Sequence, residues 1–166
     1  MESDRVENEL RRFEDMCRER GLPLTIQRRE ILRAVLERDD HPTADQVFDA
    51  VKQRITGLSR TTVYRVLDTL VDLGVARRLH HSRTCARFDG RTSRHHHLVC
   101  RLCDRVIDFN SSNLDAMALP PSNEHGFRVE DYSVQITGVC AECDRKLSSE
   151  TQTERNAQNV RSIRRD

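Results

Sequence analysis

The sequence predicts an α+β protein in which an N-terminal winged helix-turn-helix unit is followed by a small C-terminal α/β unit. Two observations carry this prediction. Before residue 75, apolar residues recur every three or four positions in four segments, and a short hairpin pattern follows them. Beyond residue 94, the apolar runs are short and strand-like, and two Cys-x-x-Cys pairs accompany them.

The first three helices are predicted from apolar spacing and from residues that cap or break a helix. The first covers residues 1–20, the second begins after an N-cap at Thr25, and the third opens from the turn that starts at His41. The side chains expected to face inward are Val6, Leu10, Phe13 and Cys17 in the first helix, Ile26, Ile31, Leu32, Val35 and Leu36 in the second, and Val47, Phe48 and Val51 in the third.

A fourth helix is predicted over residues 60–73, with Ser59 as its N-cap and Gly74 closing it in the left-handed conformation that glycine adopts readily. Two short strands, Val75–Leu79 and Cys85–Phe88, then form a hairpin. The apolar stripe of the helix consists of Val63, Val66, Leu67, Leu70 and Leu73. The opposite face carries Arg60, Thr61, Tyr64, Arg65 and Asp68.

Charge is distributed unevenly along the chain. Residues 52–87 carry eight basic and two acidic side chains, a net charge of +6, whereas the rest of the chain has a net charge of −5. A basic stretch in an otherwise acidic protein is typical of a surface that binds a polyanion. A helical bundle with no role in DNA binding is the alternative, and the exposed Tyr64–Arg65 pair within the basic stretch favours DNA binding.

The domain organisation follows from composition. We expect a DNA-binding domain over residues 1–88, a polar hinge over 89–94, an α/β domain over 95–147 and a disordered tail over 148–166, which has too few apolar residues to pack. The elements expected in the second domain are strands His97–Cys100, Val106–Phe109 and Phe127–Val139, a short helix over Asn113–Ala118, and a loop at Pro120 and Pro121.

Composition also excludes two classes of protein. Only 36% of the 166 residues are hydrophobic, and no run approaches the roughly eighteen consecutive apolar residues of a membrane span. The N-terminal residues lack the apolar core of a secretory signal. We therefore expect a cytoplasmic protein, in which paired cysteines bind metal rather than form disulfides.

Four of the six cysteines form two Cys-x-x-Cys pairs, Cys100 with Cys103 and Cys140 with Cys143. Two thiolates at positions i and i+3 chelate one ion, and two such pairs complete a tetrahedral shell that suits structural Zn²⁺. Four unrelated cysteines, or a redox pair, are the alternatives. The His-x-Glu motif of a zinc deaminase is absent.

A second group of candidate ligands combines imidazoles with carboxylates. In a strand, alternate side chains share a face, so His95 and His97 point together and His96 points away. Nitrogen and oxygen donors suit Fe²⁺ or Mn²⁺. Each residue taken singly is also typical of a turn or a solvated surface. The candidate ligands of this second metal site are His41, Asp89, His95, His97 and Asp108.

Together these motifs resemble the ferric uptake regulator superfamily of bacterial metal-dependent repressors. The residues that carry the resemblance are the segment Arg60–Leu67, the pattern His95-x-His97-x-x-Cys100-x-x-Cys103 and the pair Cys140-x-x-Cys143. The resemblance covers about residues 10–147. It implies a homodimer of winged-helix domains joined by hinges to α/β dimerisation domains, which binds inverted-repeat operator DNA. We expect no membrane partner, and we do not expect an enzyme.

Within the superfamily, the chain is most similar to the peroxide-responsive repressors. Their regulatory site has a His before Pro-Thr-Ala, an Asp after Arg-Phe, the two histidines of His-x-His and an Asp in the following strand. These map onto His41, Asp89, His95, His97 and Asp108. Iron-uptake regulators usually have glutamates at positions 89 and 108, and their additional site would need other residues at Arg94, His96 and Tyr132. Zinc-uptake regulators have a cysteine at position 89.

The resemblance implies a mechanism. One Fe²⁺ or Mn²⁺ ion would join the two domains, so that metal binding and DNA binding are coupled. With Fe²⁺, hydrogen peroxide as the signal would oxidise His41 or His95 and release the DNA, whereas the Mn²⁺ form would be insensitive. Tyr64 is expected to contact thymine methyls and Arg65 the edge of guanine. Phosphates are expected to be bound by Arg60, Thr61, Arg77 and Arg78.

The chain departs from the family pattern at Pro23, where relatives often have a lysine or arginine for the minor groove; Arg18 or Arg20 are the candidate replacements. Cys85 is interpreted as an incidental thiol. Three other functions remain open: an iron- or manganese-responsive uptake regulator without peroxide sensing, a zinc-ribbon module for protein interactions, and a thiol redox switch.

Overall fold

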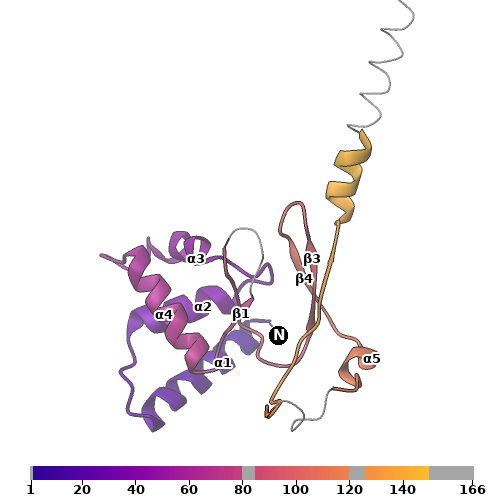
Figure 1. Cartoon of the computed structure of the whole chain (residues 1–166). Helices are drawn as coiled ribbons and strands as arrows, with labels where there is room; N and C mark the ends of the chain where they lie inside the picture. The colour runs from indigo at the N-terminus through magenta and orange to yellow at the C-terminus, as the bar shows by residue number, and fades with distance from the viewer. Residues whose placement is uncertain (1, 80–84, 120–125, 150–166) are drawn as a thin grey trace, which may run out of the picture. The chain divides into compact units, whose positions relative to one another are not determined.

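The computed structural model describes residues 2–79, 85–119 and 126–149, and the chain divides into two compact units, Met1–Arg94 and His95–Asp166 (Figure 1). Among the described residues, the first unit contains four helices and a two-stranded hairpin, and the second contains a three-stranded sheet and two helical segments, 112–115 and 141–149. The predicted α+β class is confirmed. No helix in the described part of the chain is long and apolar enough to cross a membrane.

The N-terminal unit is built around α2. Its helices are α1 (Glu2–Glu19), α2 (Ile26–Leu36), α3 (Ala44–Val51) and α4 (Arg60–Asp72). Helix α2 contacts each of the other three, and α3 also contacts α4 (Figure 1). Apolar side chains from all four helices form one buried cluster, to which the hairpin adds Phe88.

Local signals in the sequence set the helix ends. The side-chain oxygens of Thr25 and Ser59 accept hydrogen bonds from backbone N–H groups in the first turns of α2 and α4, which confirms both predicted N-caps. Thr43 and Gln46 form a reciprocal capping box at the start of α3. Gly74 has a φ of 72°, so α4 ends in the left-handed conformation as predicted.

The side chains predicted to face inward are buried or partly buried, with one exception. Ile26 is 76% exposed. It is the first residue of α2, and a side chain in a helix tilts towards the N-terminal end. Ile26 therefore points beyond the bundle, although its spacing matches the buried stripe.

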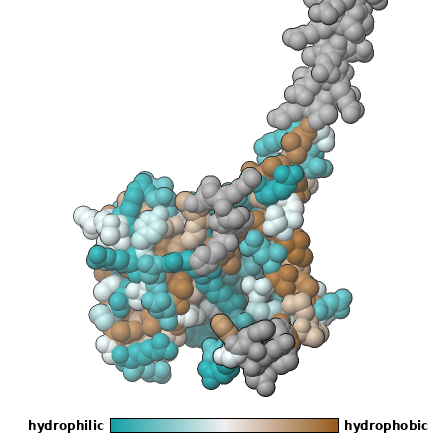
Figure 2. All heavy atoms as spheres, in the orientation of Figure 1, coloured by the Kyte–Doolittle hydropathy of each residue, from teal (hydrophilic) through white to brown (hydrophobic). Residues whose placement is uncertain are grey.

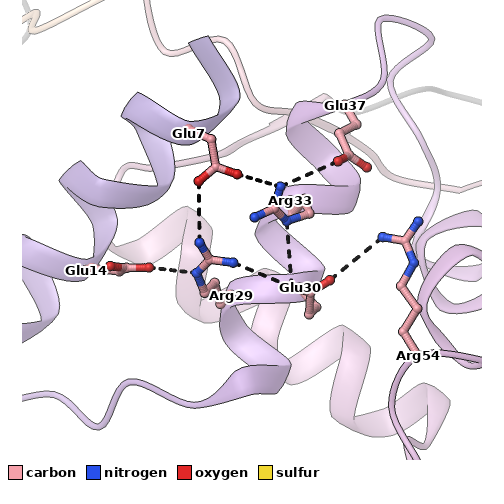
Figure 3. A network of polar contacts seen from close by, with 7 residues as sticks. All are labelled: Glu7, Glu14, Arg29, Glu30, Arg33, Glu37 and Arg54. Atoms are coloured by element: carbon pink, nitrogen blue, oxygen red, sulfur yellow. Dashed lines mark hydrogen bonds and ion pairs between the residues drawn. The ribbon is translucent and has the colours of Figure 1, made fainter. Parts of the chain in front are cut away.

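A network of ion pairs joins α1 to α2 on the surface of the N-terminal unit (Figure 3). The Arg29 guanidinium lies 2.7 Å from Glu14 and 3.5 Å from Glu7, and Arg33 lies 2.8 Å from Glu7. The network continues through Glu30, Glu37 and Arg54. Because an exposed ion pair contributes at most about 1 kcal/mol, the buried apolar side chains between the helices contribute most of the stability.

The hairpin after α4 consists of β1 (Arg77–Leu79) and β2 (Arg87–Asp89), which are antiparallel. Asp89 was expected to begin the hinge, but it is the last residue of β2 because it pairs with Arg77. The predicted loop between the strands includes residues 80–84, which lie outside the described residues.

The C-terminal unit is a sheet of order β4-β3-β5 (Figure 1). The central strand β3 (His96–Cys100) pairs antiparallel with β4 (Val106–Phe109) and parallel with β5 (Gln135–Gly138). The connection from β4 to β5 contains α5 (Ser112–Asp115). Residues 141–149 are helical.

The predicted strand Phe127–Val139 is mostly wrong, because only its last part forms a ladder, with β3. Within the described residues, 127–133 have no strand partner. The predicted loop at Pro120 and Pro121 lies outside the described residues. So does the predicted disordered tail, 148–166, except for its first two residues, which belong to the helix 141–149.

Candidate metal centres and DNA-binding surface

Four cysteines from two segments of the C-terminal unit bring their sulfur atoms together. Cys100 ends β3 and Cys103 lies in the turn to β4, whereas Cys140 and Cys143 follow β5. The parallel pairing of β3 with β5 places both segments at the same end of the sheet. All four are free thiols, and their Sγ atoms lie within 4.8 Å of one another.

The spacing of these sulfur atoms fits a tetrahedral zinc ion. The Sγ atoms of Cys103 and Cys140 are 3.7 Å apart. Four ligands at a Zn–S distance of about 2.3 Å would be separated by about 3.8 Å along each edge of the tetrahedron. The Cys103–Cys140 separation matches this edge, and no other separation in the group exceeds 4.8 Å.

The thiols differ in acidity. Backbone N–H groups of Cys140, Leu102 and Cys103 donate to Cys100 Sγ and lower the pKa of the Cys100 thiol to about 6. The hydrogen bond with Cys103 makes the largest contribution, followed by burial and the other neighbouring thiols, and together they raise the pKa of Cys143 to about 12. One thiol therefore ionises readily and another does not. A divalent cation favours the thiolate form of all of them, and its binding releases protons.

His95, His97 and Asp108 form a second group of donors in the same unit. The Nε2 atoms of both histidines lie 3.6 Å from the same Asp108 carboxylate oxygen, Oδ1. The pairing of β3 with β4 produces this convergence, because it sets His97 directly opposite Asp108. The two imidazole rings are 4.7 Å apart and buried. Two nitrogen donors and one oxygen donor therefore converge on one face of the sheet.

His41 and Asp89 form a third group of donors, in the N-terminal unit. The backbone of His41 has a φ of 53°, which is uncommon for a residue with a side chain. The Arg87 guanidinium fixes this conformation by donating to the His41 carbonyl oxygen at 2.9 Å. The Arg91 N–H orients the Asp89 carboxylate at 2.7 Å. Both side chains are buried, and a His41 ring nitrogen lies within 4.8 Å of an Asp89 oxygen.

His96 points to the opposite face of β3 from its two neighbours and has a different environment. Its Nδ1 accepts the Val134 N–H at 3.2 Å, so the neutral ring carries its proton on Nε2, which faces an Asp115 oxygen at 3.3 Å. The Tyr132 hydroxyl lies within 2.7 Å of the backbone oxygen of Asp115. These contacts join β3, α5 and the segment before β5, and they were not predicted from the sequence.

The outward face of α4 presents the side chains predicted to contact DNA. Tyr64 is 45% exposed, and Thr61 and Arg65 are also exposed. On the hairpin, Arg77 is partly buried and donates to the Thr92 carbonyl oxygen at 2.7 Å.

Two of the predicted phosphate-binding arginines are ion-paired within the N-terminal unit. Arg60 contacts Asp45 of α3, and Arg78 contacts Asp68 of α4. Each guanidinium also lies over an aromatic ring, at 4.6 Å and 5.5 Å from the ring centre respectively. Neither pair was predicted from the sequence. Asp68 carried a signal, since it shares the exposed face of α4, whereas Asp45 is distant in sequence from its partner.

The sequence model of the ferric uptake regulator family matches residues 19–137 of the chain. The chain belongs to this family. Members of the family are dimeric, DNA-binding, metal-responsive transcription regulators and not enzymes. The peroxide-responsive repressor PerR of Staphylococcus aureus (strain Mu50) is 31% identical over 146 residues, which are 88% of this chain and 99% of that protein.

Solved structures of family members have a similar fold. The ferric uptake regulator of Francisella tularensis with iron aligns with a TM-score of 0.62 and 28% identity, over 75% of this chain and 96% of that one. The Helicobacter pylori regulator Fur aligns with a TM-score of 0.69 over 84% of this chain and 93% of that one. Its sequence identity of 21% supports the shared fold alone.

Proposed function

We propose that this family member is a homodimeric, metal-dependent repressor that binds operator DNA and senses hydrogen peroxide through oxidation of a ligand histidine. The observation that carries the proposal is the presence of two chemically different donor sets, one of sulfur and one of nitrogen and oxygen. A closed set of thiolates suits a permanent structural Zn²⁺, held by Cys100, Cys103, Cys140 and Cys143. Imidazoles with carboxylates suit an exchangeable Fe²⁺ or Mn²⁺.

The regulatory ion is proposed to bind both groups of nitrogen and oxygen donors at once. Asp89 and His95 are separated only by residues 90–94, a tether that spans at most about 22 Å when fully extended. An ion bound by His41 and Asp89 of one unit and by His95, His97 and Asp108 of the other would fix the orientation of the DNA-binding unit. By linkage, DNA would then raise the affinity for the ion as much as the ion raises the affinity for DNA.

A row of exposed apolar side chains supports the proposed homodimer. Leu98 of β3 stands directly opposite Ile107 of β4 and Ile136 of β5, and each of the three side chains is between 42% and 44% exposed. Figure 2 shows hydrophobic surface over the C-terminal unit. A second copy of the chain would remove this row from water.

The DNA-binding part of the proposal predicts that Tyr64→Ala and Arg65→Ala each weaken binding about ten- to a hundredfold, because a good base contact contributes about 1–3 kcal/mol. The measurement is fluorescence anisotropy with a duplex selected from a random library by the Mn²⁺-loaded wild-type protein. Arg54→Ala is the matched control for Arg65→Ala, since it removes an equal charge from the same basic stretch but Arg54 pairs with Glu30 of α2. Unchanged binding by all three variants would place the base contacts outside Tyr64 and Arg65, and failure to select any duplex would favour a zinc-ribbon interaction module.

The sensing part predicts a gain of one oxygen on His41 or His95 when the Fe²⁺-loaded protein meets a small excess of hydrogen peroxide. Bound Fe²⁺ supplies one-electron chemistry with peroxide that Mn²⁺ does not. Overall, the imidazole loses two electrons and gains one oxygen atom, and peroxide is reduced to water. An oxidised imidazole is a poor ligand, so the two units would separate and release the DNA.

Peptide mass spectrometry of the Fe²⁺ and Mn²⁺ forms measures this reaction, and His96 is an internal control in the same peptide as His95. Because His96 faces Asp115 rather than the donor group, oxidation at the ion should spare it. Histidines that stay unmodified in both forms would favour an iron- or manganese-responsive uptake regulator. Loss of zinc with reducible disulfides would favour a thiol switch.

A further inference from the structure

Two carboxylates lie on the surface that is proposed to meet DNA. Asp68 is on the exposed face of α4, one turn beyond Tyr64 and Arg65. Asp45 is in the first turn of α3. Their side chains are 55% and 51% exposed. A carboxylate in such a position repels the phosphates of DNA, which is unfavourable for a protein that only needs to bind it.

Each carboxylate holds one arginine in a defined place. Asp45 pairs with Arg60, whose guanidinium lies over the Phe48 ring, and Asp68 pairs with Arg78, whose guanidinium lies over the Phe88 ring. Each arginine is therefore held by a carboxylate and by a ring of its own unit.

Arg65 differs from these two arginines. It is also on the exposed face of α4, but it has no ion pair among the residues that the structure describes. The carboxylates therefore pair with Arg60 and Arg78, which are expected to bind phosphates. They do not pair with Arg65, which is expected to contact a base.

We propose that Asp45 and Asp68 restrain DNA binding. By pairing with Arg60 and Arg78, they weaken the phosphate contacts that supply almost all of the affinity for DNA of arbitrary sequence. The base contacts proposed for α4 do not depend on these pairs, so the restraint acts on the sequence-independent part of binding. This inference rests on the proposed DNA-binding function.

Helix stabilisation explains only one of the two carboxylates. Asp45, in the first turn of α3, interacts favourably with the helix dipole. Asp68 lies well inside α4, where the dipole gives a carboxylate no such advantage. The two residues share a different property, which is an arginine partner on the proposed DNA-binding surface.

The test measures binding of the full-length, zinc-replete and Mn²⁺-loaded protein to a short duplex of random sequence by fluorescence anisotropy. Asp45→Asn and Asp68→Asn are each expected to bind about two- to fivefold more tightly at low salt, as the loss of an exposed ion pair predicts. The gain should shrink as the salt concentration rises. Asp72→Asn is the matched control: it makes the same charge change on α4, but Asp72 has no ion pair in the described part of the chain.

An Arg60→Ala background tests whether Asp45 acts through Arg60, because there Asp45→Asn should bring little further gain. The proposal would be overturned if both variants bound the random duplex no more tightly than Asp72→Asn, or if Asp45→Asn gave its full gain in the Arg60→Ala background. Thermal unfolding of each variant verifies that it is folded. If the wild-type protein binds neither the random nor the selected duplex, the proposed function fails instead.

Discussion

Replacement of Cys140 by serine is expected to remove zinc from the protein and to unfold the C-terminal unit. In the described residues, the large buried apolar cluster lies entirely in the N-terminal unit. Among the described residues of the C-terminal unit, the buried apolar side chains are Val99, Cys100 and Val106. A unit with so little apolar core depends on another source of stability, and structural zinc sites contribute apparent binding free energies of about 10–16 kcal/mol.

A hydroxyl group is a poor replacement for a thiolate, so Cys140→Ser should leave three ligands and bind zinc weakly. Elemental analysis would show less than one zinc per chain, and thermal unfolding would show a separate, early transition for the C-terminal unit. The N-terminal helices should stay folded, since their buried apolar cluster contains only residues of the N-terminal unit. Dimerisation should fail together with the sheet that carries the row of Leu98, Ile107 and Ile136.

Cys85→Ser is the matched control for this experiment. Cys85 is an exposed free thiol in the N-terminal unit, outside the four-thiol group. This variant should keep its zinc and its stability. If Cys140→Ser also retained a full equivalent of zinc and a folded sheet, the four thiols would not form the site proposed for them.

Features set by neighbouring residues were predictable from the sequence. The caps Thr25 and Ser59 and the left-handed Gly74 follow from short-range hydrogen bonding and steric rules, and these predictions are confirmed. Ile26 shows the limit of apolar periodicity. Spacing specifies the face of a helix, but it does not specify whether the bundle extends far enough to cover that face.

For the candidate sites, the sequence predicted the donors but not the contacts that position them. Alternation along β3 separates His96 from its neighbours, whereas the approach of His97 to Asp108 depends on the register between β3 and β4. The ion pair between Arg60 and Asp45 depends on the packing of α3 against α4. Such contacts arise from tertiary structure, which local patterns do not encode.

Replacement of His97 by alanine is expected to weaken binding of Mn²⁺ at least about a hundredfold, since even a residue that only supports a ligand contributes ten- to a hundredfold. If one ion joins the two units, the variant should bind the selected duplex no better with Mn²⁺ than without it. Mn²⁺ is the probe of choice, because the proposed oxidation does not occur with it. Calorimetry gives the metal affinity, and anisotropy gives the DNA affinity.

Asp115→Asn is the matched control, because it disturbs the opposite face of β3 through His96 and leaves His97 and Asp108 in place. It should bind Mn²⁺ and DNA like the wild-type protein, and both variants should keep one zinc per chain. If the His97→Ala protein still needed Mn²⁺ for DNA binding, at the same ion concentration as the wild-type protein, the ion would act at another site. Loss of the Mn²⁺ effect on DNA binding would establish that the His97 imidazole controls the DNA-binding unit through the metal. His97 belongs to the C-terminal unit, whereas the proposed DNA contacts belong to the N-terminal unit.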